Sequence, residues 1–359
     1  MWPDRRYQEL VGIDLPIVQA PMAGCNLAPL ASAVSGAGGL GSLPCAMLTP
    51  DQARTQVQLV QQQTDRPLNL NFFTHKPAAP DDAREAAWRQ RLARYYEELG
   101  LDMADIPQGA IREPFSSAMS ALVLEMRPRV ISFHFGLPDA EALRPLKDAG
   151  IVIQSSATTV AEARWLAAHG ADAIIAQGAE AGGHRGMFLS DDVANQVGTL
   201  SLLPQVVDAV DLPVVAAGGI ADARGIVAAL ALGASAVQIG TAYLFCPEAE
   251  TSTVHRAALS SPRNEITAIT NVMTGRPARG IVNRLIAEVG PLSDLAPAFP
   301  MAATAVTPLR TAGETAGSGE FSPLWAGQSA PLARSLGAAE LTRTLASEAQ
   351  ALMRRMSGA

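Results

Sequence analysis

The chain has 359 residues, of which 48% are hydrophobic and 17% are charged, and its formal net charge is −7. This composition excludes a disordered or fibrous protein, and the negative charge argues against general binding to nucleic acid. No run approaches the roughly 18 apolar residues of a membrane span, and the N-terminal segment lacks the apolar region of a signal peptide. The three cysteines have no CxxC spacing, which favours free thiols in a reducing compartment. We therefore expect a cytoplasmic protein with no nucleic-acid or membrane partner.

Eight short apolar runs, rich in β-branched residues, punctuate the first 245 residues. Segments 159–169, 202–210 and 222–232 separate the later runs and have helical spacing of Ala, Leu and Val. Alternation of strand and helix predicts parallel pairing with right-handed crossovers, and eight such units predict an α/β (β/α)8 TIM barrel. An open doubly wound sheet is the alternative. The eight runs are 16–22, 39–43, 68–73, 130–136, 151–155, 173–177, 213–218 and 236–241.

Two stretches depart from this rhythm. Residues 76–129, with a long polar helix and a second helical pattern, form an insertion after the third strand. Beyond Glu250 the chain gives one more barrel helix, a mobile-looking stretch at 313–328 and a final helix at 338–356. We predict a barrel of residues 1–75 and 130–262, with a capping, substrate-binding region of 76–129 and 263–359. The alternative is that both stretches are peripheral.

Glycines at the ends of the last predicted strands indicate a phosphate site. Gly218 and Gly219 follow the seventh strand, and Gly240 and Thr241 follow the eighth. In (β/α)8 barrels this is the common place for phosphate, because backbone N–H groups and a helix N-terminus converge there. The alternative is a tight turn and a plain helix start. Asp222 suits the N-cap of the next helix and is not assigned to the site.

The segment QGAEAGGHRG, residues 177–186, follows the sixth strand and brings a glycine turn and His184 together. Gly182 allows close approach of the main chain to an anion, and His184 would lie beside the bound group. A loop whose glycines only turn the chain is the alternative. His134 lies in an alternating strand, so it is either a core histidine or a substrate ligand.

Other polar and soft side chains at the strand ends suit a flat ring. Met22, after Ala20 and Pro21, offers an apolar surface, while Asn71 and Gln177 offer amide groups to the edges of a ring. A flavin would use all of these groups.

These motifs resemble the nitronate monooxygenases, formerly called 2-nitropropane dioxygenases, and most closely their bacterial class I type. The resemblance covers most of the chain in the expected order, and AQGAEAGGHRG is its most specific motif. The matching segments are QAPMAG (19–24), AGGLGSL (37–43), NLNFF (69–73), SFHFG (132–136), AQGAEAGGHRG (176–186), AAGGIAD (216–222), QIGTAYLFCPEA (238–249) and PLWAGQ (323–328).

The resemblance implies an FMN-dependent barrel without a metal. It would oxidise alkyl nitronates, notably propionate 3-nitronate, with O2 to a carbonyl compound and nitrite. His184 would be the catalytic histidine, and we expect His184 and His134 to bind substrate. The residues expected to contact FMN are Ala20, Pro21, Met22, Asn71, Gln177, Gly182, Gly218, Gly219, Gln238, Gly240, Thr241 and Gln328.

The sequence also departs from the family pattern. Family active sites often include tyrosines and a lysine from the capping region, whereas this chain has Phe299 there and no lysine after Lys147. Two other functions stay open. One is an FMN-dependent NAD(P)H:quinone or enoyl-acyl-carrier reductase on the same barrel, and the other is a flavin-free, phosphate-binding lyase or isomerase.

Overall fold

The computed structural model describes residues 2–79, 81–106 and 113–358. Eight parallel strands form its central sheet, in the order β1-β9-β8-β6-β5-β4-β3-β2. A parallel bridge between Val18 and Leu40 brings the two edge strands together, which closes the barrel and excludes the open sheet. The strands are β1 (Ile17–Gln19), β2 (Gly41–Pro44), β3 (Leu68–Phe73), β4 (Val130–His134), β5 (Val152–Ala157), β6 (Ala173–Gln177), β8 (Val214–Ala217) and β9 (Ala236–Ile239).

These strands match the eight predicted runs, with small differences at the ends. The first strand stops at Gln19, and the following Ala20-Pro21-Met22 turns into the mouth of the barrel. Pro21 has no N–H for a ladder, so the strand is expected to end near this position.

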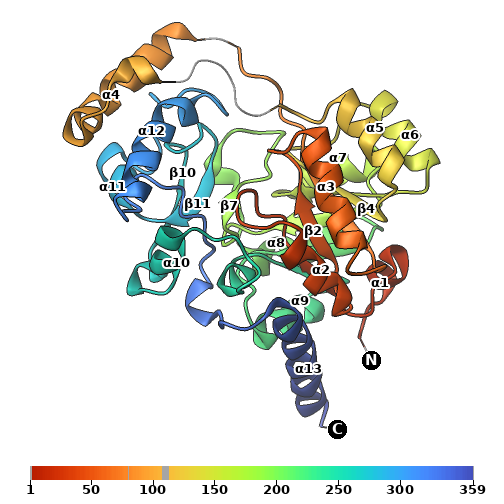
Figure 1. Cartoon of the computed structure of the whole chain (residues 1–359). Coiled ribbons are helices and arrows are strands. Elements are labelled where there is room, and N and C mark those ends of the chain that lie inside the picture. Colours follow the sequence, from red (N-terminus) through yellow and green to blue (C-terminus); the bar gives the residue numbers. More distant parts are fainter. Residues whose placement is uncertain (1, 80, 107–112, 359) are drawn as a thin grey trace.

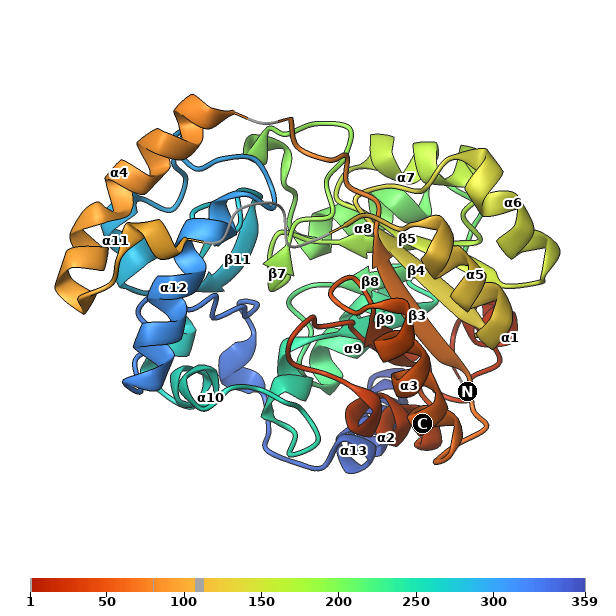
Figure 2. The ribbon, with the colours of Figure 1, turned by 45° about the horizontal axis from the view of Figure 1, so that its top comes forward.

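Within the described ranges, eight helices cover the outside of the barrel, and Figures 1 and 2 show how they surround the strands. Many begin at a residue whose side chain accepts a hydrogen bond from the first turn, including Thr49, Asp139, Thr159 and, as predicted, Asp222. The covering helices are α2 (Ala28–Gly36), α3 (Pro50–Gln61), α5 (Ser117–Met126), α6 (Ala140–Asp148), α7 (Val160–Ala168), α8 (Thr199–Val207), α9 (Ala223–Ala231) and α13 (Ala338–Ser357).

The N-terminal helix α1 (Arg6–Val11) closes the end of the barrel opposite to the strand C-termini. Tyr7 and Val11 are fully buried and belong to the same apolar cluster as the strand residues Val130 and Val215. The Tyr7 hydroxyl donates to Oε1 of Gln154, 2.8 Å away. The barrel interior is therefore filled at this end, and a cavity opens toward the strand C-termini.

A smaller lobe lies beside the barrel mouth, at the left of Figure 2. Its core packs Trp88 and Tyr95 of α4 against Leu309 of α12 and Ile286 of α11. A three-stranded antiparallel sheet, in the order β10-β11-β7, joins the lobe to the loop after β6. The elements are α4 (Asp82–Leu99), β7 (Gly183–His184), α10 (Thr253–Leu259), β10 (Thr267–Thr270), β11 (Ala278–Ile281), α11 (Arg284–Val289) and α12 (Ala302–Thr315), with short 3-10 helices at Met103–Asp105, Val193–Asn195, Thr241–Phe245, Pro262–Glu265 and Ala330–Leu332.

Three expectations for the insertion and tail need correction. Helix α5 packs on α3 and α6, and α13 packs on α2 and α9, so both cover the barrel although they lie in segments assigned to the cap. Helix α10, expected on the barrel, packs instead with β11 and the tail, because Leu259 shares an apolar cluster with Ile281 and Leu324. The stretch 313–328 is not loosely attached, since Phe321 and Leu324 are buried.

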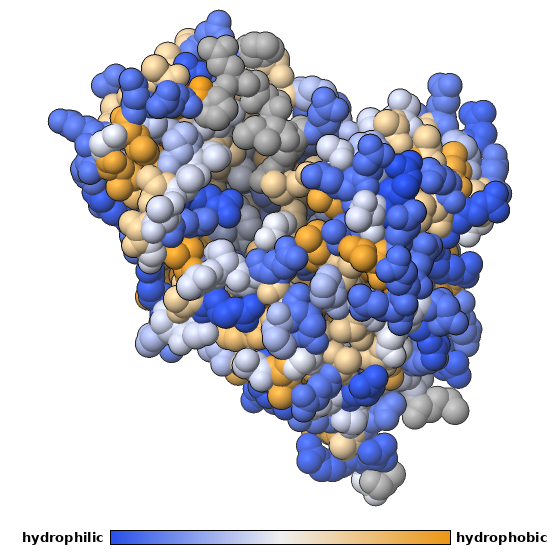
Figure 3. Space-filling view, in the orientation of Figure 1, coloured by the Kyte–Doolittle hydropathy of each residue, from blue (hydrophilic) through white to orange (hydrophobic). Residues whose placement is uncertain are grey.

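On the face shown in Figure 3, hydrophobic residues are scattered in small groups among hydrophilic ones. No helix in the described ranges is both long and apolar enough to cross a membrane.

Candidate active site

A cavity opens at the C-terminal ends of the barrel strands and encloses about 1300 Å³ of empty space, its open mouth included. The barrel supplies one wall, and the lobe and tail supply Trp325, Gly327 and Ser329 on another. The predicted site residues that line it are Ala20, Pro21, Met22, Asn71, His134, Gln177, Gly182, His184, Gly218, Gly219, Gln238, Gly240 and Thr241.

Gln328 is the predicted site residue that does not line the cavity. Its side chain is exposed, and its backbone N–H donates to the carbonyl of Glu180 at 3.0 Å. Its two neighbours bind to the strand ends instead. The Gly327 N–H donates to Oγ1 of Thr241 at 2.9 Å, and the Ser329 hydroxyl donates to the carbonyl of Gly219 at 2.8 Å. The tail thus binds to the ends of β8 and β9 through one backbone N–H group and one hydroxyl group.

The glycine turns at these strand ends suit an anion. Gly218 and Gly219 have φ of +112° and +70°, which side-chain-bearing residues rarely adopt. Within the described part of the chain, the backbone N–H groups of Gly219, Gly240 and Thr241 donate no hydrogen bond. Unpaired N–H groups that meet at the end of two strands form the phosphate seat of many (β/α)8 barrels.

Position 182 has no room for a side chain, because the tail crosses directly over it. A Cβ atom there would lie 2.5 Å from the backbone nitrogen of Gly327. The glycine is therefore required by close packing of two backbones. Its neighbour Gly183 has a left-handed φ of +75° and open space around it.

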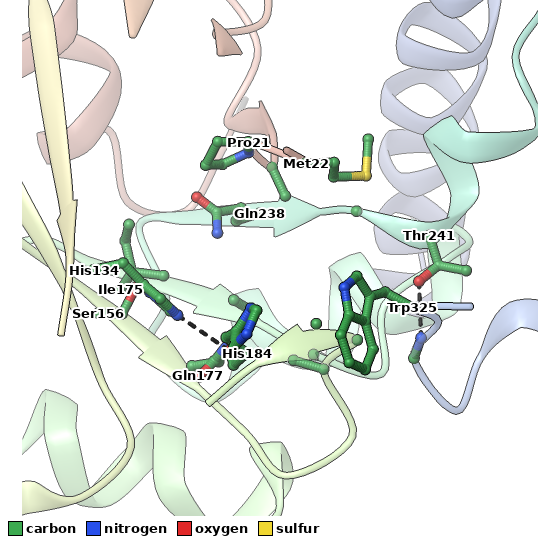
Figure 4. A pocket seen from close by; sticks show the side chains of 18 of the residues that line it. Pro21, Met22, His134, Ser156, Ile175, Gln177, His184, Gln238, Thr241 and Trp325 are labelled. Carbon is green, nitrogen blue, oxygen red and sulfur yellow. Dashed lines mark hydrogen bonds between the residues drawn. The ribbon is translucent and has the colours of Figure 1, made fainter. Parts of the chain in front are cut away.

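The loop after β6 holds His184 by its carbonyl oxygen. Nε2 of His134 lies 3.1 Å from this oxygen, and Nε2 of Gln177 donates to it at 3.0 Å (Figure 4). The carbonyl can only accept, so His134 carries its proton on Nε2, and Nδ1 accepts from the Ser156 hydroxyl at 3.0 Å. Burial lowers the pKa of His134 to about 3. His134 is thus a neutral ring whose two nitrogens are both engaged.

Gln177 and Arg185 complete this support. The Gly186 N–H donates to Oε1 of Gln177 at 2.7 Å, so both ends of the Gln177 amide bind the loop. Arg185 is fully buried and donates to the Gln177 carbonyl at 2.9 Å and to Oε1 of Gln196 at 2.7 Å. Burial lowers the pKa of Arg185 to about 9. The sequence analysis predicted that the Gln177 amide lies at the edge of a bound flat ring. In the structure both ends of this amide bind the loop that carries His184.

The His184 ring projects into the cavity among aromatic side chains. Its Nε2 lies 2.9 Å from Oγ1 of Thr274. The ring centroids of Phe299 and Trp325 lie 5.4 Å and 5.5 Å away, and that of Phe73 lies 6.2 Å away. In Figure 4, Pro21, Met22 and Gln238 face His184 and Trp325 across the cavity. A flat group between these walls would meet an apolar face and polar edges.

Several lining residues were missed from the sequence. His255 from α10 lines the cavity, and its Nε2 donates to the Trp325 carbonyl at 3.1 Å; burial lowers its pKa to about 4. Ser156, Phe73 and Trp325 are also on the wall. Ser156 is recognisable from the sequence at the end of the fifth strand, and the family resemblance placed the tail at the barrel through Gln328, but no local signal indicates that α10 reaches the barrel.

The model of the nitronate monooxygenase family matches residues 4–348. The chain belongs to the nitronate monooxygenase family. A nitronate monooxygenase from Pseudomonas aeruginosa is 44% identical over 352 residues, which cover 96% of this chain and 98% of that protein. The members of the family are flavin-dependent oxidoreductases. The family assignment thus confirms the resemblance found in the sequence and the enzyme class.

Solved structures support the same assignment. The nitroalkane oxidase from Streptomyces ansochromogenes superposes with a TM-score of 0.90 at 40% identity, covering 98% of this chain and 99% of that one. FabK from Thermotoga maritima superposes with a TM-score of 0.73 at 26% identity, covering 99% and 98%. The barrel architecture of this chain is therefore shared with both of these solved structures.

Proposed function

We propose that this chain oxidises alkyl nitronates with O2, using FMN, to a carbonyl compound and nitrite. The arrangement that carries the proposal is one cavity whose wall contains both the unpaired N–H groups of Gly219, Gly240 and Thr241 and the side chain of His184. In the overall reaction, two nitronates and one O2 give two carbonyl compounds and two nitrite ions. The C=N bond of each nitronate breaks, and each carbon receives one oxygen atom from O2.

The residues of the cavity fit FMN. The free N–H groups of Gly219, Gly240 and Thr241 would hold its phosphate. Oε1 of Gln238 is buried and accepts no hydrogen bond within the described part of the chain, so it would accept from an N–H at the edge of the ring. Met22 would lie against the ring. Bound FMN would supply the acceptor for electrons from the nitronate and their transfer to O2.

The protein groups would orient and neutralise the substrate. A nitronate has already lost its α-proton, so His184 would hold the anionic nitro group rather than remove a proton. For a neutral nitroalkane the same ring would have to take the α-proton as a general base. His134 and Gln177 would fix the position of His184 through its carbonyl. The apolar rings around His184 would exclude water from the reacting carbon.

The first test is oxygen uptake by the FMN-loaded protein with a nitronate, beside NADH or NADPH with a quinone. Rapid uptake with two nitrite ions released per O2 and no nicotinamide requirement supports the proposal. Nicotinamide oxidation without a nitronate response would assign a reductase instead.

A binding experiment tests the cofactor separately. We expect FMN to bind at least about 100-fold more tightly than riboflavin, because only FMN carries the phosphate for the glycine N–H groups. Equal binding of FMN and riboflavin would contradict the phosphate seat. Failure of both flavins to bind would leave the flavin-free lyase or isomerase as the better interpretation.

A further inference from the structure

The turn that joins β10 to β11 reaches the active-site histidine from the side of the lobe. Thr274 lies in this turn and is buried. Its Oγ1 lies 2.9 Å from Nε2 of His184. Thr274 is not among the described residues that line the cavity, whereas His184 is. The Nε2 edge of the imidazole is therefore directed into the lobe, toward a side chain behind the cavity wall.

The turn that carries Thr274 is fixed within the lobe. Val272 is fully buried in the apolar core that α4 and α12 share. The Gly275 N–H donates to the carbonyl of Asn271 at 2.7 Å. The Asn271 side chain binds the backbone of Ser293 through both ends of its amide, at 3.0 Å and 2.9 Å. The Thr274 hydroxyl is thus held at a defined position by the packing of its neighbours.

The backbone of His184 is fastened to the same part of the lobe. His184 pairs with Ala278 in the antiparallel ladder of β7 and β11. The N–H of Arg185 donates to the carbonyl of Pro277 at 2.8 Å. Both the main chain and the ring of His184 therefore contact residues 274–278. This short segment fixes where the histidine lies and how its ring is rotated.

The hydrogen bond between Thr274 and His184 also has a direction. The carbonyl oxygen of Arg276 lies 3.5 Å from Oγ1 of Thr274 and can only accept. A hydroxyl has a single hydrogen, and when that hydrogen is directed to this carbonyl, the oxygen accepts from Nε2 of His184. The neutral imidazole then carries its proton on Nε2. Nδ1 is the nitrogen that gains a proton when the ring becomes cationic.

We propose that Thr274 is a positioning residue for the reaction, because its hydroxyl accepts from Nε2 of His184, fixes the rotation of the ring and selects the Nε2–H tautomer. A proton taken from a neutral nitroalkane would then have to arrive at Nδ1, since Nε2 already carries one. The kinetic consequence rests on the proposed function. The tautomer does not, so the two can be tested separately.

Two variants of Thr274 separate its hydroxyl from its shape. Thr274→Val keeps the branched shape without the hydroxyl, and Thr274→Ser keeps the hydroxyl without the methyl group. With the FMN-loaded protein and propyl-1-nitronate, we expect Thr274→Val to lower kcat/KM by about tenfold and Thr274→Ser by less than about threefold.

Thr304→Val is the matched control for the loss of a buried hydroxyl from the lobe. The Thr304 hydroxyl donates to the carbonyl of Met301 at 2.8 Å, and Thr304 is not among the cavity-lining residues that the structure describes. We expect this variant to change kcat/KM by less than about twofold. Equal kcat/KM in Thr274→Val and Thr274→Ser would overturn the positioning role. An equal loss in Thr304→Val and Thr274→Val would overturn it too, because it would show a general effect on the lobe.

The tautomer is measured by NMR without any substrate. In the FMN-loaded protein with isotope-labelled histidine, the couplings of each ring nitrogen to the carbon-bound ring protons distinguish Nε2 from Nδ1, and His184→Asn identifies the signals of His184. At about pH 9, well above the ordinary pKa of histidine, we expect the proton on Nε2 in the unaltered protein and in Thr274→Ser. Thr274→Val should show a mixture of both tautomers.

A proton on Nδ1 in the unaltered protein, or an unchanged tautomer in Thr274→Val, would overturn the inference whether or not nitronates are substrates. Absence of nitronate turnover in the unaltered protein would instead contradict the proposed function. The NMR result would then decide by itself whether Thr274 selects the tautomer of His184.

Discussion

The carbonyl oxygen of His184 lies 3.1 Å from Nε2 of His134, although the two residues are 50 positions apart in the chain. This hydrogen bond connects the end of β4 to the loop after β6. It gives the two histidines different tasks: His134 holds the backbone, and the His184 ring faces the cavity. Both ring nitrogens of His134 are engaged, so we propose that it positions His184, in place of the predicted contact with substrate.

His184→Asn is expected to retain flavin and lose turnover. The loss should be about 10-fold with a nitronate but about 100-fold or more with the corresponding neutral nitroalkane, because only the latter needs a base. Steady-state kcat/KM with both substrates measures the difference. His169→Asn, at an exposed histidine outside the cavity, is the matched control. Equal losses with nitronate and nitroalkane would remove the base role.

His134→Phe is expected to lower kcat/KM by about tenfold or more, because the His184 carbonyl loses a buried donor. His134→Gln keeps an amide N–H that can reach a carbonyl, so it should recover part of the activity. Flavin content should stay near that of the unaltered protein in both variants. If Phe and Gln behave alike in kcat/KM, the hydrogen bond to His184 does not position the loop.

The buried neutral histidines make the fold sensitive to acid. The pKa values of His134 and His255 are lowered by burial from 6.5 to about 3 and about 4, so below pH 6.5 the unfolded chain binds protons that the folded chain does not. The free energy of unfolding is therefore fully maintained above this pH and falls as the pH decreases toward 4, by up to about 1.4 kcal/mol per pH unit for each histidine.

Urea unfolding at a series of pH values measures this slope. His255→Gln should give a shallower decrease below pH 6.5 than the unaltered protein, because one titrating group is removed. Parallel curves for His255→Gln and the unaltered protein would exclude His255 as a source of acid sensitivity.

Gly219→Val is expected to weaken FMN binding by at least about tenfold. Gly219 has φ of +70° at the cavity, so valine would both strain the turn and move the N–H group away from the phosphate. Gly150→Val is the matched control, since Gly150 has φ of +74°, nothing within 4 Å of an added Cβ, and a place before β5, at the other end of the barrel. Titration of the apoproteins with FMN compares the two. Equal weakening in both variants would indicate a general loss of stability instead of a damaged phosphate seat.

The sequence by itself determined the barrel and thirteen of the residues that line the cavity. Strand runs, caps such as Asp222 and glycine turns such as Gly218-Gly219 are local patterns, and the parallel topology brings all strand C-termini to one mouth. Thirteen predicted site residues meet there for this reason.

Only the tertiary structure decided how the site is closed and supported. Gly327 bonds to Thr241 across 86 residues, and Ser329 bonds to Gly219 across 110, while α13 returns to cover the barrel beside α2 and α9. The hydrogen bonds that fix the ring of His134 likewise join separate strands. Such contacts depend on the path of the whole chain and on burial, because neither Trp325 nor His134 carries a local pattern that specifies its partner.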